Sequence, residues 1–123
     1  MSGQVTGIGG VFIRAQDAEE LRRWYADHLG LQIEGPAGAQ FAASAGATSV
    51  FSVFPADTTY FGRPDQACMV NFRVDDLDAV LERLRAAGAE VDDETMDGEY
   101  GKFGWAVDPE GNRFELWEPP AGE

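Results

Sequence analysis

The sequence predicts an α+β fold in which two paired βαβββ modules form a curved mixed sheet around a cavity, with the helices on the outside. Three observations lead to this prediction. The chain ends in a clear β-hairpin, the order strand, helix, strands occurs twice, and 123 residues are enough for one compact domain but too few for two. Each helix can cover only one face of its strands, so we expect the uncovered faces to enclose the cavity that binds a small molecule.

The C-terminal hairpin is the clearest element, and it contains the main candidate residue, Glu115. Residues 108–111 read Asp-Pro-Glu-Gly, a turn sequence in which Pro presets φ and Gly takes the left-handed position. Side chains alternate along a strand, so Phe114 and Leu116 point to one face and Glu115 and Trp117 to the other. A solvent-facing strand that carries a glutamate is the alternative interpretation.

The repeat supplies the rest of the architecture. The first copy reads as strands over residues 11–15, 31–33, 40–44 and 49–54, with a helix that Asp17 caps and Gly30 ends. The second copy restarts with a strand over residues 70–74 and a helix that Asp76 caps and Gly88 ends. We therefore expect a single domain, residues 1–123, with module one at about 6–54, a linker at 55–66 and module two at about 67–119.

Composition limits the classes of partner. The net charge is −13, from 22 acidic and 9 basic residues, and such a charge repels nucleic acids and anionic membrane surfaces. No apolar run approaches the roughly 20 residues of a membrane span, and the first ten residues lack the features of a signal peptide. The single cysteine, Cys68, excludes an internal disulfide. A cytoplasmic protein that binds neither nucleic acid nor membrane is expected.

Three stretches of the chain resemble the vicinal oxygen chelate superfamily, which includes glyoxalase I, extradiol dioxygenases and bleomycin-resistance proteins. They are VFIRAQDAEELRRWYADHLGL at 11–31, VNFRVDDLDAVLERLRAAGAEV at 70–91 and DPEGNRFELWE at 108–118. The resemblance covers about residues 6–119 and implies paired βαβββ modules. It also implies a homodimer, because members of the superfamily are often dimers.

The resemblance further implies four cavity-facing positions that bind a divalent metal in the metal-dependent members. These positions fall on Gly10, Ser52, Met69 and Glu115. Only Glu115 is a good ligand, because glycine has no side chain, serine binds weakly and a thioether is too soft. One carboxylate cannot hold such an ion. No metal and no other cofactor is therefore expected, and a divalent metal held through other residues is the alternative.

Strand alternation assigns side chains to the cavity. The expected ligand-binding residues are Phe12, Arg14, Ser52, Asn71, Arg73, Trp105, Glu115 and Trp117. Trp105 is expected opposite Glu115 across the hairpin. An aromatic lining with a few polar groups suits an aromatic or cationic organic ligand. In the alternative interpretation, Arg14 and Arg73 pair with Glu115 or nearby acidic residues and only close the structure.

Two functions remain open. The first is metal-free binding of a small organic ligand between the modules, as the bleomycin-resistance branch of the superfamily implies. An acidic surface would speed encounter with a cationic ligand. The second is a lyase, isomerase or dioxygenase-type enzyme that uses Glu115 as a general base or as a metal ligand. Whether the protein is an enzyme stays open at this point.

Overall fold

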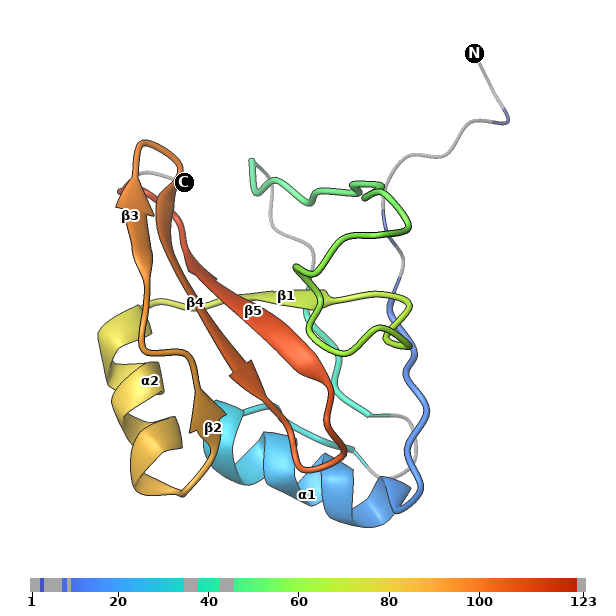
Figure 1. Cartoon of the computed structure of the whole chain (residues 1–123). Helices are drawn as coiled ribbons and strands as arrows, with labels where there is room; N and C mark the ends of the chain where they lie inside the picture. Colours follow the sequence, from blue (N-terminus) through green and yellow to red (C-terminus); the bar gives the residue numbers. More distant parts are fainter. Residues whose placement is uncertain (1–2, 4–7, 9, 35–37, 43–45, 122–123) are drawn as a thin grey trace.

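The structure is a computed structural model that describes residues 3, 8, 10–34, 38–42 and 46–121. The described residues form two helices and one five-stranded sheet (Figure 1). The elements are α1 (Ala18–Leu29), β1 (Val70–Arg73), α2 (Leu77–Ala86), β2 (Glu90–Val91), β3 (Met96–Gly98), β4 (Gly101–Val107) and β5 (Arg113–Glu118). This arrangement confirms an α+β fold with a mixed, open, curved sheet.

The sheet is built around the hairpin of β4 and β5. The strand order is β1-β5-β4-β2, and β3 also pairs with β4. β1 runs parallel to β5, whereas the other pairs are antiparallel. The predicted turn joins β4 to β5: the Gly111 amide donates to the Asp108 carbonyl at 2.9 Å, and Gly111 has a φ of +86°. The hairpin therefore forms as its turn sequence indicates.

Both helices begin at their predicted caps, and α1 ends at the predicted glycine, whereas α2 ends at Ala86, two residues before Gly88. The Asp17 carboxylate accepts a hydrogen bond from the Glu20 amide at 3.0 Å, and the Asp76 carboxylate accepts one from the Ala79 amide at 3.1 Å. Gly30, directly after α1, takes the left-handed conformation that lets a helix end. These caps satisfy amides that would otherwise lack partners in the first turn of each helix.

The core lies between the helices and one face of the sheet. In Figure 1, α2 lies to the left of the β4–β5 hairpin, α1 lies below the turn of the hairpin, and the segment that leads into β1 lies to the right. The buried cluster consists of Leu77, Val80, Leu81, Leu84, Ala106, Phe114 and Leu116. Phe72 and Val74 pack against this cluster, as their positions in the predicted strand require. Polar and aromatic side chains lie on the opposite face of the sheet.

The first half of the chain differs from the expected pattern of strands. Residues 11–15 and 49–54 form no strand, and the one bridge in this half joins Ile33 to Ala39 among the residues that the structure describes. Part of the expected strand 40–44 lies outside the described residues. The physical reason is that a strand needs a partner for its backbone hydrogen bonds, and residue preferences do not supply one.

Neither helix could cross a bilayer. α1 has 12 residues and α2 has 10, and no helix within the described ranges has the length and apolar content of a membrane span.

Candidate functional site

Glu115 lies at the centre of a cross-strand row on the open face of the sheet. In the strand register, Glu115 of β5 stands opposite Asn71 of β1 and opposite Trp105 of β4. The alternation along β5 puts Phe114 and Leu116 in the core and therefore turns Glu115 to the other face. Glu115 is nevertheless only 9% exposed, because neighbouring side chains cover it.

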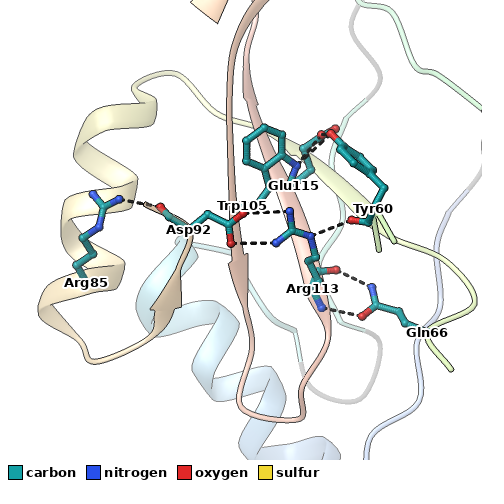
Figure 2. Close-up of polar contacts among 7 residues, drawn as sticks. All are labelled: Tyr60, Gln66, Arg85, Asp92, Trp105, Arg113 and Glu115. Atoms are coloured by element: carbon teal, nitrogen blue, oxygen red, sulfur yellow. Dashed lines mark hydrogen bonds and ion pairs between the residues drawn. The ribbon is translucent and has the colours of Figure 1, made fainter. Parts of the chain in front are cut away.

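Three neutral donors bind the Glu115 carboxylate. The Asn71 amide Nδ2 donates to Oε1 at 2.6 Å, and the Trp105 indole Nε1 donates to Oε2 at 2.9 Å. The Tyr60 hydroxyl also donates to Oε2. Figure 2 shows Tyr60 and Trp105 meeting at Glu115. A carboxylate that accepts several hydrogen bonds is held in one orientation and needs no cation to be buried.

Tyr60 reaches Glu115 from residues 55–66, a segment outside the sheet. Burial raises the pKa of Tyr60 to about 12, and the hydrogen bond and negative charge of Glu115 add to this effect, whereas the Trp105 indole and the Arg113 charge oppose it. The hydroxyl is therefore a stable donor to Glu115 at neutral pH. The ring stands edge-on to Trp105, with centroids 6.0 Å apart.

Arg113 fixes the 55–66 segment to the hairpin. Its Nε donates to the Tyr60 carbonyl at 2.9 Å, and its Nη1 and Nη2 donate to the two carboxylate oxygens of Asp92 at 3.0 and 3.1 Å. The Gln66 side chain accepts from the Arg113 amide and donates to the Arg113 carbonyl, so it binds the backbone as a neighbouring strand would. These contacts, drawn in Figure 2, place Tyr60 over the row.

A second row of side chains lies next to the first on the same face. The register aligns Arg73 with Trp117, and Trp117 with Phe103. The Arg73 guanidinium lies 4.8 Å from the centroid of the Trp117 ring, and the Phe103 ring stacks on Trp117 at 6.2 Å with an interplanar angle of 11°. This aromatic surface is partly exposed and adjoins Glu115.

The structure brings together five of the eight expected ligand-binding residues and leaves three apart. Asn71, Arg73, Trp105, Glu115 and Trp117 occupy the two rows. Phe12 is 95% exposed, and Arg14 and Ser52 are exposed as well, because their segments are not paired with the sheet. The alternative interpretation, in which the arginines pair with Glu115, does not hold for Arg73, whose Nη2 donates to the Thr48 carbonyl at 2.7 Å.

Sequence reasoning missed Tyr60 and the anchoring role of Arg113. Tyr60 lies in a stretch with one glycine and one proline, TTYFGRP, which reads as a connection between two modules. Two adjacent aromatic residues in such a stretch are the signal that could have found it, because an exposed linker has little use for them.

The residues at the metal positions do not fit a divalent ion. Within the part of the chain that the structure describes, no three His, Cys, Asp or Glu side chains come together. Gly10 and Ser52 are exposed and lie on unpaired segments. The Glu115 oxygens face the protons of Asn71, Trp105 and Tyr60, and a cation would have to displace these donors.

A surface hollow of about 410 Å³ lies elsewhere, beside α2, and shares no residue with the two rows. Its lining residues are Asp78, Leu81, Glu82, Arg85, Asp93 and Thr95. We do not regard it as the binding site, because mostly charged and exposed side chains surround it, whereas ligand sites are mainly apolar with a few convergent polar groups.

Comparisons with known proteins agree with the fold. The search of curated proteins found no sequence relative of this chain. Among solved structures, the antibiotic-binding protein TnmS3 from Streptomyces sp. CB03234 is 25% identical, with a TM-score of 0.57, over 94% of this chain and 100% of the other. A glyoxylase/bleomycin resistance protein/dioxygenase domain from Frankia sp. EAN1pec is 20% identical, with a TM-score of 0.60, over 98% of this chain and 96% of the other.

A member of the glyoxalase/bleomycin resistance protein/dioxygenase superfamily from Sphaerobacter thermophilus DSM 20745 has the same fold. It is 18% identical, with a TM-score of 0.55, over 93% of this chain and 98% of the other. The family model of the glyoxalase-like domain matches residues 10–117, which is most of the chain. This chain therefore belongs to the glyoxalase-like domain family of the vicinal oxygen chelate superfamily.

Proposed function

We propose that this protein binds a small organic ligand, aromatic or cationic, on the open face of the sheet and without a metal. The observation that carries the proposal is the buried Glu115 carboxylate, held by three neutral donors beside the Arg73–Trp117–Phe103 stack. Such a face offers aromatic area for stacking and one fixed acceptor for orientation, the combination that ligand sites use.

The comparison with TnmS3 supports binding as the function, because that protein is described as antibiotic binding and is similar over nearly the whole length of this chain. The donor set around Glu115 supports the absence of a metal. The alternative is an enzyme in which Glu115 acts as a general base on a substrate that takes the place of the Tyr60 donor.

The proposal includes a homodimer in the cytoplasm. Phe12, Phe51 and Val53 are exposed large apolar side chains on the two unpaired segments of the first half, and burial of such side chains is a reason for two proteins to associate. The single cysteine fits a reducing compartment. In this proposal, the second copy covers the apolar segments.

The test is a thermal-shift screen of aromatic and cationic compounds on the wild type and on Glu115→Gln, with Glu90→Gln as the matched control on the exposed strand β2. We expect hits that stabilise the wild type and Glu90→Gln equally. Cationic hits should lose about tenfold or more in affinity to Glu115→Gln, because the charge is gone, whereas neutral aromatic hits should stay within about tenfold.

Two further measurements distinguish the alternative. Each hit is incubated with the wild type and analysed by mass spectrometry, and metal content is measured on protein expressed with Mn, Fe, Ni and Zn. Compounds recovered unchanged and metal far below one per chain agree with the proposal. Turnover that Glu115→Gln abolishes, or stoichiometric metal, would replace it with the enzyme.

A further inference from the structure

The ring of Tyr60 fills the place directly over Glu115 and makes contacts that an aromatic ligand would make. Its hydroxyl donates to the Glu115 carboxylate and accepts from the Trp105 indole Nε1 at 3.1 Å. Its ring stacks on Phe54, with centroids 5.5 Å apart and an interplanar angle of 7°. We propose that Tyr60 is a self-ligand in this slot and that the ligands of this protein are hydroxylated aromatic compounds, which displace it.

The chemistry of the slot selects the hydroxyl group. A phenolic oxygen bound there donates to Glu115 and also accepts from the Trp105 indole, whose proton it shares with Glu115. An ammonium group cannot accept a hydrogen bond, and a ring without a polar atom would leave Glu115 with one donor fewer. Phe54 stacks on this ring and Trp105 stands edge-on to it, so the slot suits an aromatic ring next to that hydroxyl.

The fold allows Tyr60 to leave the slot without loss of its backbone position. The Tyr60 carbonyl is bound to Arg113, and Asp92 in turn holds Arg113, so the main chain stays in place. Phe54, which covers the ring on its outer side, is exposed and belongs to an unpaired segment. Rotation of the Tyr60 side chain about its own bonds therefore suffices to open the slot, and such rotations are fast.

A self-ligand reduces the apparent affinity of any competitor by the fraction of molecules in which the slot is open. Tyr60→Phe keeps the ring but loses the hydrogen bonds to Glu115 and Trp105. Because a hydrogen bond to a charged group is strong, the phenylalanine ring should leave the slot more readily, and a phenolic ligand should bind about tenfold more tightly. If Tyr60 instead contacted the bound ligand, Tyr60→Phe would weaken the binding of the phenolic ligand.

The experiment is isothermal titration calorimetry with 2-naphthol, naphthalene and 2-naphthylmethylamine on the wild type, Tyr60→Phe and Tyr60→Ala. The control variant is Tyr100→Phe, at the exposed turn between β3 and β4. We expect 2-naphthol to bind most tightly of the three probes, to gain about tenfold in both Tyr60 variants and to be unaffected in Tyr100→Phe. Circular dichroism checks that each variant folds. If Tyr60→Ala does not fold, Tyr60→Phe alone provides the test.

This inference rests on the proposed function, but each can fail alone. Equal or weaker binding of 2-naphthol to Tyr60→Phe, or a preference for the amine, overturns the self-ligand and leaves other organic ligands of the thermal-shift screen in place. Turnover or stoichiometric metal overturns the proposed function, and the tenfold gain in Tyr60→Phe would still stand. Absence of binding by all probes and all screened compounds would overturn both.

Discussion

Glu115 accepts hydrogen bonds from three side chains, and the chain supplies them from three separate places. Tyr60 comes from the 55–66 segment, Asn71 from β1 and Trp105 from β4. None of these donors loses its proton near neutral pH, since Tyr60 has a pKa of about 12 and an amide and an indole do not titrate there. The setting of the carboxylate should therefore stay constant over the physiological pH range.

The alkaline titration of Tyr60 gives a direct test of this setting. The folded pKa of about 12 lies above the usual value of about 10, so the contribution to stability is complete below pH 10 and is lost as the pH rises through 12. The absorbance of phenolate, as the difference between the wild type and Tyr60→Phe, isolates this group among three tyrosines. Half-ionisation near pH 10 would show that Tyr60 is not held against Glu115.

The hairpin turn was enough to predict Trp105 opposite Glu115, and strand alternation put Asn71 on the same face. The parallel pairing of β1 with β5, which makes Asn71 the other neighbour of Glu115, was not predicted, because no local turn fixes it. Tyr60 could not be found in this way. It is 55 positions from Glu115 in the sequence and belongs to a segment outside the sheet. The alternation of side chains along strands does not predict where such a segment packs.

At the scale of elements, the 55–66 segment and the hairpin act as a unit because Arg113 and Asp92 join them. The exposed fractions of these two side chains are only 17% and 35%, so solvent screens their charges weakly. The Arg85 side chain donates to the Asp92 carbonyl at 3.0 Å and ties the loop after β2 to α2. The position of Tyr60 thus depends on contacts that reach across the sheet to a helix.

Arg113→Ala should lower the free energy of unfolding by about 2 kcal/mol, less than for a fully buried pair because Asp92 keeps some contact with solvent. Arg23→Ala is the matched control, because its pair with Glu19 is 61% and 81% exposed. Its cost should stay below about 0.5 kcal/mol. Urea unfolding monitored by tryptophan fluorescence measures both, and equal costs would show that Arg113 anchors nothing.

The elements that the sequence predicted correctly are those with local causes. Asp17 and Asp76 cap their helices through amides three residues away, and Gly111 completes a four-residue turn. Residues 11–15 and 49–54 have equally clear strand preferences but form no strand. Whether these residues form strands depends on a neighbouring strand that can accept and donate their backbone hydrogen bonds. Composition does not reveal whether this chain supplies such a strand.

At the scale of the whole molecule, the exposed apolar segments favour association of two chains, whereas the net charge of −13 on each chain opposes it. Sedimentation of the wild type should show a dimer that becomes tighter as salt screens the repulsion between two acidic chains. The change of the dimer dissociation constant with salt distinguishes this apolar interface from an interface held by ion pairs, because ion pairs weaken as salt rises. The division into two modules, about 6–54 and 67–119, stays a prediction.

The double substitution Phe51→Ser and Val53→Ser should weaken the dimer by at least about a hundredfold, because two apolar side chains per chain lose their burial. Tyr100→Ser is the control, since Tyr100 is also exposed but lies in the second half of the chain. Sedimentation equilibrium measures the three proteins. A wild-type monomer, or the same dissociation constant in all three, would contradict the proposed dimer.

The sequence separations within the Glu115 row imply an order of assembly during folding. Trp105 is ten positions from Glu115, and a hairpin of this kind closes in about 1–10 μs. Asn71 is 44 positions away and Tyr60 is 55, so their contacts require larger loops to close and form later. An early folding species would therefore contain the hairpin with an uncovered carboxylate, and quenching of Trp105 by the arriving Tyr60 would mark the completion of the Glu115 row.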